Sequence, residues 1–334
     1  MADMRLLVLG GTHHVGRAFV EEALARGDAV TTLTSGRSGP PADGAEARYA
    51  DRHDPAAVAS ALGDDTWDAV VDTWSHAPVA VRTTAELLRG RVGHLTYIST
   101  VSVYTWPFGP GVTESAPVVA GDPDSTESSD YAAAKRGGEL AIPDDVPALV
   151  ARAGLILGPY ENVGRLPFWL TRISEGGRVP CPGPQDRPLQ YVDARDIARW
   201  VLGAAERGVT GVLNTVSEPG HTTIGALLEE CHRVTGSNAE LVWVTPEQVE
   251  AAGVEPWTEL PIWVPPTGDL ADLHAIDSSA ARAAGLTCRP MEETVADTWA
   301  WLRREGVPER ATDRGGAVLG PAAEARLLGE PSPG

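Results

Sequence analysis

The sequence lacks several features that mark other classes of protein. It has only three cysteines in 334 residues, Cys181, Cys231 and Cys288, and their wide spacing suits neither a zinc site nor a disulfide framework. Its eight histidines are scattered, without the paired spacing of a helical metal site. No apolar run approaches the roughly 18 residues that span a membrane. These absences predict a cytoplasmic protein without a metal ion and without a membrane segment.

Positive charge is also scarce. Lys and Arg total 27 against 46 Asp and Glu, which gives a formal net charge of −19. The acidic residues are spread along the chain, so a polyphosphate or an anionic membrane would be repelled on average. We therefore expect no nucleic acid and no membrane as a partner.

The first half of the chain alternates short β-rich runs with helical stretches. Strands are predicted at residues 5–9, 29–33, 67–73, 94–99 and 148–152. Between the first two, an apolar face with helical spacing runs from Val15 to Leu24, and Gly27 is placed to end that helix. This alternation predicts an α/β fold of the Rossmann type, with a doubly wound parallel sheet.

Beyond residue 158 the pattern becomes less regular, with Pro- and Gly-rich loops between the helical stretches 194–206 and 224–234. Residues 1–158 are predicted to form the dinucleotide-binding domain. Residues 189–216 return to it through strands at 189–192 and 212–216. Residues 159–188 and 217–305 are predicted to form a smaller, interleaved substrate-binding lobe, and residues 306–334 a C-terminal tail.

A glycine-rich turn directly follows the first predicted strand. It reads Gly10-Gly11-Thr12-His13-His14-Val15-Gly16 and leads into the amphipathic helix. Glycines in such a turn let the backbone approach a pyrophosphate, and the helix amides stabilise its charge. His13 stands where the usual fingerprint has a glycine. The sequence therefore predicts a dinucleotide site at Gly10, Thr12, His13 and Gly16, with an ordinary strand-to-helix turn as the alternative.

The end of the second strand bears on the choice of cofactor. An acidic residue there would bind a ribose 2′-hydroxyl and repel a 2′-phosphate, but the stretch reads Thr34-Ser35-Gly36-Arg37. Ser35 and Arg37 suit a phosphate, and His13 is a further possible donor. The sequence favours NADP(H), with NAD(H) possible. A solvated loop charge is the alternative role for Arg37.

Tyr131 and Lys135 lie one helical turn apart in a stretch of good helix formers. They follow the strand that ends in Ser99-Thr100, at the sheet edge where ligands bind in open α/β folds. A tyrosine normally titrates near pH 10, so a neighbouring cation that favours the phenolate is chemically informative. The Thr100 hydroxyl would align a substrate oxygen with the phenol. The three residues predict proton transfer at that oxygen.

With these residues in place, the chain resembles the extended short-chain dehydrogenase/reductase family, also called the NAD-dependent epimerase/dehydratase family, over about residues 4–305. By this resemblance Thr100, Tyr131 and Lys135 are catalytic. The further motifs that carry it are Asp51-Arg52, Val71-Asp72-Thr73, Val103-Tyr104, Arg152-Ala153-Gly154, Gly158-Pro159, Asp277-Ser278-Ser279, Ala284-Gly285-Leu286 and Arg289-Pro290.

The resemblance also implies contacts to the cofactor. The Asp51-Arg52 pair belongs to the cofactor site, with Asp51 facing the adenine. Thr73 and Trp74 lie at the middle of the cofactor, and Gly154 and Leu155 at its nicotinamide side. A homodimer is implied as well, formed by the helix with Tyr131 and a helix near residues 79–89.

Two departures from the family pattern narrow the chemistry. His13 indicates an atypical subgroup whose first turn has a bulky residue after Gly-Gly-Thr. Val101 and Ser102 stand where the 4,6-dehydratases of the family have Asp and Glu, so dehydration is disfavoured. Hydride transfer or epimerisation remains. We expect an NADP(H)-dependent oxidoreductase acting on a small molecule, with two alternatives: an epimerase that keeps its NAD(P), and a non-catalytic dinucleotide- or RNA-binding relative.

The substrate site is the least determined part of the sequence. Trp106 and Trp169 are predicted in loop-like segments near the cleft, where their rings could wall a substrate. Core packing is the alternative for each. Arg187, like Arg165, would anchor a phosphate if the substrate carried one, and a surface salt bridge is the alternative.

Overall fold

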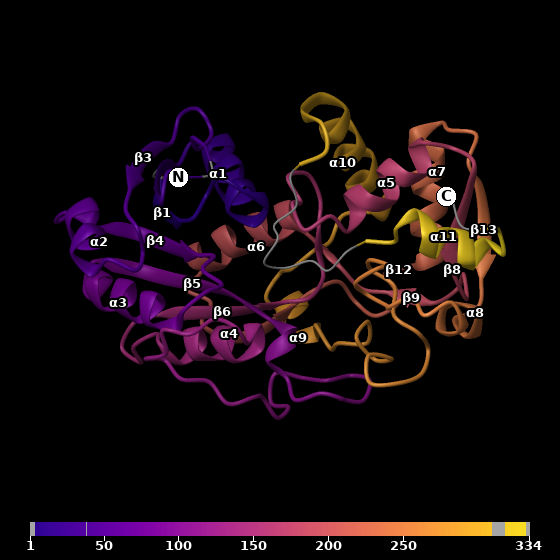
Figure 1. The fold of residues 1–334 in the computed structure, drawn as a ribbon. Coiled ribbons are helices and arrows are strands. Elements are labelled where there is room, and N and C mark those ends of the chain that lie inside the picture. Colours follow the sequence, from indigo (N-terminus) through magenta and orange to yellow (C-terminus); the bar gives the residue numbers. More distant parts are fainter. Residues whose placement is uncertain (1–3, 38, 309–317, 332–334) are drawn as a thin grey trace.

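A seven-stranded, entirely parallel sheet organises the N-terminal part of the computed structural model, which describes residues 4–37, 39–308 and 318–331 (Figure 1). The strand order is β11-β6-β5-β4-β1-β2-β3. The strands are β1 (Arg5–Leu9), β2 (Ala29–Thr34), β3 (Glu46–Tyr49), β4 (Trp67–Asp72), β5 (Val92–Thr100), β6 (Ala148–Ala153) and β11 (Gly211–Thr215). This confirms the predicted doubly wound α/β fold.

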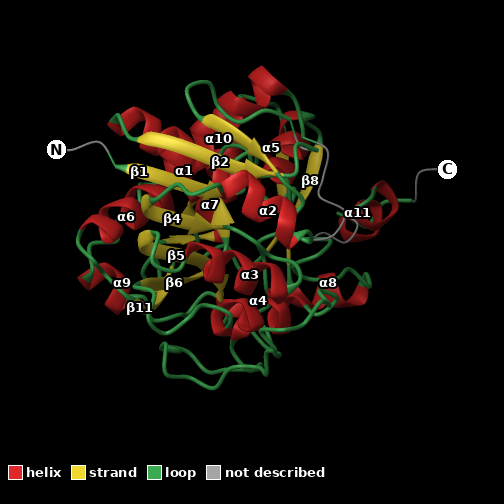
Figure 2. Cartoon of the chain, turned by 90° about the vertical axis from the view of Figure 1, so that its left-hand side faces the viewer, coloured by secondary structure: helices red, strands yellow, loops and turns green. Residues whose placement is uncertain are grey.

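Helices cover both faces of this sheet, because its central strands are apolar on both sides (Figure 2). One face packs against α1 (His14–Arg26) and α6 (Ala194–Glu206), which also contact each other. The other face packs against α2 (Pro55–Leu62), α3 (Pro78–Leu88) and α4 (Tyr131–Leu140). The carboxyl ends of the parallel strands therefore share one edge, where the loops can form a site.

The five predicted strands are all present, within two residues at each end. β3 was not among the ranges predicted from β-rich runs. It has only four residues, Glu46-Ala47-Arg48-Tyr49, lies at the edge of the sheet and is largely exposed, so it has no buried run to mark it. Gly27 ends α1 in the left-handed conformation, as the sequence predicts.

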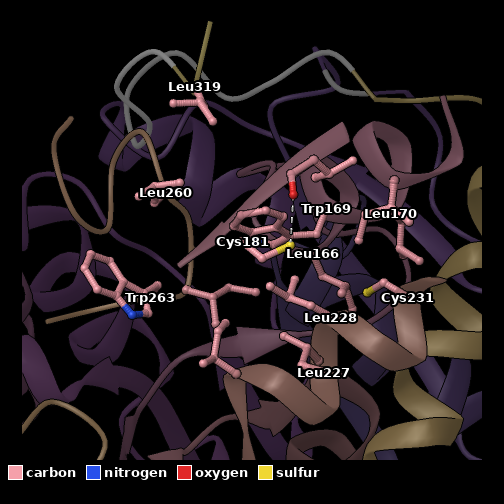
Figure 3. Close-up of a cluster of buried hydrophobic side chains, with 14 of the residues drawn as sticks. Leu166, Trp169, Leu170, Cys181, Leu227, Leu228, Cys231, Leu260, Trp263 and Leu319 are labelled. Atoms are coloured by element: carbon pink, nitrogen blue, oxygen red, sulfur yellow. Dashed lines mark hydrogen bonds between the residues drawn. The ribbon is translucent and has the colours of Figure 1, made fainter. Parts of the chain in front are cut away.

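A second hydrophobic core fills the C-terminal lobe (Figure 3). It is built by α5 (Leu166–Ser174), α7 (Ile224–Thr235) and α10 (Met291–Glu305), which pack against one another, and by the parallel pair β8 (Arg178–Pro182) and β13 (Glu240–Val244) followed by α8 (Pro246–Ala251). Within the predicted lobe, α9 (Ser279–Ala283) instead contacts β11, and Ala281 and Leu286 join the core of the sheet domain.

One prediction about the C-terminal half is wrong. Residues 189–192 do not form a strand of the main sheet: β9 (Pro188–Leu189) pairs with β12 (Thr222–Thr223), and β10 (Val192–Asp193) pairs with β7 (Ile156–Leu157). Gln190 between them bonds to His274 instead of to a neighbouring strand. Of the two predicted returning strands, only β11 joins the main sheet, where it pairs with β6.

The predicted C-terminal tail contains a helix among its described residues. Residues Pro321–Leu328 form α11, which starts with a proline in its first turn and ends at Gly329 in the left-handed conformation. The helix packs against β8, and Glu324 pairs with Arg172 of α5. It therefore extends the second core.

Candidate active site

The turn between β1 and α1 brings the start of the helix against its own backbone. Gly10 and Gly11 have φ angles of 116° and 118°, which side chains rarely adopt. A Cβ added at Gly16 would lie 2.6 Å from the amide nitrogen of Gly11, so only glycine allows this approach. The amides at the helix start consequently face an open turn, the arrangement that binds the pyrophosphate of a dinucleotide.

A cavity of about 400 Å³ opens in front of this turn. The loops after β1, β2, β3 and β4 line it, so four strand ends contribute to one hollow. Of the residues predicted to contact the cofactor, the cavity lining contains Gly10, Thr12, His13, Ser35, Arg37, Asp51, Arg52, Thr73 and Trp74. Its size and polar rim fit one half of a nicotinamide dinucleotide.

The rim of the cavity carries an exposed ion pair. The Arg37 guanidinium lies 3.1 Å from the Asp51 carboxylate, and the side chains are 74% and 48% exposed. Asp51 also accepts the backbone N–H of His53 at 3.0 Å. This N–H, with the Arg37 charge, lowers the pKa of Asp51, while partial burial lowers the pKa of His13. The predicted phosphate anchor and the predicted adenine contact are thus neighbours.

The floor of the cavity carries a buried ion pair. Arg52 donates two hydrogen bonds to Asp72, at 2.7 and 2.8 Å, and others to the Ala80 carbonyl and the Thr84 hydroxyl. Its guanidinium also lies 4.9 Å from the Trp74 ring centroid. Arg52 is predicted as part of the cofactor site. Its charge is paired with buried Asp72, and its guanidinium packs on Trp74 of the cavity wall.

Thr100, Tyr131 and Lys135 gather at the carboxyl end of β5, because α4 packs directly on this strand. Thr100 ends β5 and is nearly buried, and its hydroxyl lies 3.2 Å from that of Ser102. Asp130 caps α4 and so places Tyr131, 38% exposed, as the first residue of the helix.

Lys135 is only 3% exposed. Its ammonium donates to the Trp74 and Ile98 carbonyls, both at 2.6 Å. Because Trp74 lines the cavity, one residue joins the cavity wall to the lysine. The arrangement can hold a cation beside a phenol, next to a cavity that fits one half of a dinucleotide.

The remaining predicted residues lie away from the cavity. Its described lining does not include Gly154 or Leu155; Gly154 packs against Val216, and Leu155 belongs to the second core. Trp106 is partly buried and stacks on Phe108 with ring centroids 4.0 Å apart. Gly16 is not part of the cavity lining and packs against the backbone of Gly11.

Trp169 does not line a cleft, contrary to the prediction. It lies in α5 and not in a loop, is fully buried, and donates its indole N–H to the Pro261 carbonyl at 2.8 Å. The spacing Leu166, Trp169, Leu170, Ile173 already has the pattern of a core-facing helix (Figure 3).

Arg187 is not in a surface salt bridge of the described residues. Its partly buried guanidinium donates to the Val264, Pro265 and Ala271 carbonyls. These carbonyls fix the side chain within the C-terminal lobe.

Two residues of the site escaped the sequence analysis. Tyr97, three positions before Thr100, lies with its ring centroid 4.7 Å from the Lys135 ammonium. Glu139, four residues after Lys135 and so on the same helical face, accepts hydrogen bonds from Ser99 at 2.6 Å and from Arg152 at 2.9 and 2.8 Å. The spacing of four residues from Lys135 could have identified Glu139 as a neighbour of the site. Tyr97 lies in an apolar strand, so its sequence context indicates only a core residue.

Comparison with known proteins agrees with this geometry. The family model of the NAD-dependent epimerase/dehydratase family matches residues 6–216. A Streptomyces protein named 3-diazoavenalumate denitrifying reductase is 26% identical over 235 residues, which cover 64% of this chain and 76% of the relative.

Solved structures share the fold at lower identity. The Bordetella bronchiseptica enzyme WbmH in complex with NAD⁺ has a TM-score of 0.69 at 20% identity and covers 91% of this chain and 99% of its own. A UDP-glucose 4-epimerase has a TM-score of 0.66 at 15% identity and covers 92% of this chain and 100% of its own.

The described ranges contain neither a group of metal-ligating side chains nor a helix that could cross a membrane. Over residues 4–37, 39–308 and 318–331, no three His, Cys, Asp or Glu side chains are grouped to hold a metal ion. In the same ranges, no helix has the length and apolar content to cross a bilayer.

Proposed function

The chain belongs to the NAD-dependent epimerase/dehydratase family, and from this premise we propose that it is an NADP(H)-dependent oxidoreductase that interconverts a carbonyl and a secondary alcohol on a small molecule. The observation that carries the proposal is the buried Lys135 ammonium, one helical turn from Tyr131 in α4. It donates to the carbonyl of Ile98, which lies two residues before Thr100 in β5. The Streptomyces relative, a reductase by name, supports this class of reaction.

The residues around the glycine turn fit a nicotinamide dinucleotide, since a Cβ at Gly16 would push the helix start away from the turn. The amides of Gly11 and Thr12 would hold the pyrophosphate, and Ser35 and Arg37 a ribose 2′-phosphate. When bound, the nicotinamide supplies or accepts a hydride at the substrate carbon.

The chain's own residues manage the proton. The Thr100 hydroxyl holds the substrate oxygen against the Tyr131 phenol. In reduction the phenol gives its proton to that oxygen, and in oxidation the phenolate takes the proton back. The Lys135 ammonium, held by two carbonyls, stabilises the phenolate by its charge. Water restores the proton of Tyr131 after each reduction.

The test is Tyr131→Phe, which removes the proton and keeps the ring. NADPH oxidation with a panel of small carbonyl compounds should fall by about 10²- to 10⁴-fold, the usual contribution of general acid–base catalysis. The affinity for NADPH, measured by its fluorescence, should change little. Tyr49→Phe is the matched control, since Tyr49 is 55% exposed on β3. Full activity of Y131F would overturn the proposal.

An epimerase is the second candidate, favoured by the structural likeness to a UDP-glucose 4-epimerase. The same Tyr131 and Lys135 would serve it, but the hydride would return to the opposite face of the substrate and the cofactor would stay bound. Mass analysis of the purified protein distinguishes the two: retained dinucleotide supports the epimerase, and stoichiometric NADPH consumption supports the reductase.

We also propose a homodimer formed through α3 and α4 of each subunit. The two helices pack side by side, and Leu140 of α4 is 44% exposed. Light scattering should give twice the monomer mass, and Leu140→Asp should lower it. A monomeric wild-type protein would contradict this.

A further inference from the structure

Tyr97 encloses the lysine from the side of the sheet. It lies in the middle of β5, opposite Asp72 of β4 and Val150 of β6, and is 1% exposed. Its ring centroid is 4.7 Å from the Lys135 ammonium, within the range of a cation–π interaction. Its hydroxyl donates to the Trp74 carbonyl at 3.1 Å. The same carbonyl accepts from Lys135, so tyrosine and lysine share one acceptor.

The helix opposite provides the space that this tyrosine needs. Gly138 lies three residues after Lys135 and therefore on the same side of α4. A Cβ added at Gly138 would lie 2.3 Å from the Tyr97 hydroxyl oxygen, so a larger residue there would have to displace the tyrosine ring. The contact between the tyrosine and the lysine thus depends on a glycine in the helix that carries the lysine.

Tyr97 stays neutral chiefly because it is buried. Asp72 and Glu139 both act on its phenol electrostatically, and each is also bound by an arginine, Arg52 and Arg152 respectively. Burial raises the pKa of Tyr97 well above its ordinary value. The phenol therefore stays protonated, and its hydroxyl remains a donor to the Trp74 carbonyl.

We propose that Tyr97 is a positioning residue: its ring face, and its hydroxyl acting through the Trp74 carbonyl, hold the Lys135 ammonium where it stabilises the Tyr131 phenolate. This inference rests on the proposed function, because it assigns Lys135 the task of acting on Tyr131. It also connects the cofactor cavity to the proton-transferring residue, since Trp74 belongs to the cavity wall.

The experiment measures ionisation of the Tyr131 phenol without any substrate. Ultraviolet absorbance is titrated with pH for the wild type, Tyr97→Phe and Tyr97→Leu, and each curve is compared with that of the same protein carrying Tyr131→Phe. The midpoint should rise in the order wild type, Y97F, Y97L. For Y97L we expect about one pH unit, a tenfold change, in line with a desolvated cation–π contact.

Tyr104→Leu is the matched control. Tyr104 is also fully buried, its ring lies 4.9 Å from the Arg152 guanidinium, and its hydroxyl bonds to Asn214 at 2.6 Å. Its loss should cost comparable stability and leave the midpoint unchanged. An unchanged midpoint in Y97L, or an equal shift in Y104L, would overturn the inference.

If Y97L does not fold, Gly138→Ala is the second variant. It moves the Tyr97 phenol without removing it, and the midpoint of Tyr131 in this variant should also rise. An unchanged midpoint there overturns the inference.

The failure of this inference can be told apart from the failure of the proposed function. A wild type that binds no NADPH and transfers no hydride ends the proposed function, even where the midpoints follow the expected order. A wild type that turns over with unshifted Y97L and Y97F midpoints ends only the role of Tyr97.

Discussion

Several buried charged side chains are held differently in the two parts of the molecule. In the sheet domain Arg52 pairs with Asp72, and Arg152 with Glu139, in each case through two hydrogen bonds of 2.7 to 2.9 Å, while Lys135 bonds to two backbone carbonyls. In the C-terminal lobe Glu230 also pairs with Arg233, but three other ionisable groups bond to the backbone. Glu161 accepts the amides of Arg165 and Leu166, both at 2.9 Å, while His274 and Arg187 bond to loop backbone groups.

This difference follows from the regularity of the backbone. The strands of a parallel sheet bond mostly to one another, so few of their backbone groups are left for side chains. Irregular loops contain backbone N–H and C=O groups that have no backbone partner, and side chains can bond to these groups. Burial then shifts the lobe's groups toward their neutral forms: it raises the pKa of Glu161, lowers that of Arg187 and lowers that of His274 to about 4. His274 should therefore contribute to the pH dependence of stability.

The largest expected effect tests the pairing in the sheet domain. Asp72→Asn leaves Arg52 buried without its counter-charge, which should cost about 3 to 5 kcal/mol of the free energy of unfolding. Asp145→Asn, which breaks an exposed pair with Arg89, should cost far less, because water screens that pair. Urea unfolding at pH 7 measures both. Equal losses in the two variants would remove the distinction between buried and exposed pairs.

The second effect tests the pH response of the lobe. Unfolded His274 takes up a proton near pH 6.5, whereas the folded side chain does so only at about 4. The unfolded state therefore binds more protons between these values, and stability falls as the pH drops from 6.5 toward 4. The shift corresponds to at most about 3 kcal/mol.

His274→Gln can keep a donor to the Ile262 carbonyl and cannot titrate, so its unfolding free energy should fall less steeply over this pH window. His53→Gln, at an exposed histidine, is the control and should keep the wild-type slope. Urea unfolding at several pH values supplies the slopes. A slope unchanged in H274Q would show that other groups cause the pH response.

The smallest effect on stability concerns the exposed pair at the cavity rim, which departs from the pattern of the buried pairs. Asp51→Asn should leave the free energy of unfolding almost unchanged, because its pair with Arg37 is exposed to water. It should nevertheless favour NADPH over NADH, because it removes a carboxylate 3.1 Å from Arg37 that would repel a 2′-phosphate. Arg37→Gln should shift the ratio of the two dissociation constants the other way. If neither variant changes that ratio, the rim does not select the cofactor.

The regular part of the fold could be predicted because burial on both faces leaves a clear pattern. The runs that became β1, β4 and β5 are apolar, and the glycine turn follows directly after the first. β3 could not be found this way, being short and exposed. Trp169 was misplaced because its helix was taken for a loop, although the spacing of its neighbours was that of a helix.

Contacts between distant segments were beyond prediction. Nothing in the sequence near Arg187 indicates that residues 264–271 would supply its carbonyl partners, nor does Tyr97 indicate that Gly138 would face it. Such contacts depend on how the elements pack, and packing is set by the whole chain.

The sequence by itself determined the parallel sheet, the glycine turn and the order of Thr100, Tyr131 and Lys135, because periodicity and turn chemistry act between neighbours along the chain. Only the tertiary structure decided which partners the buried charges have, that Arg52 faces inward, and that a tyrosine of β5 encloses the lysine of α4. These depend on distances through space, which local patterns do not specify.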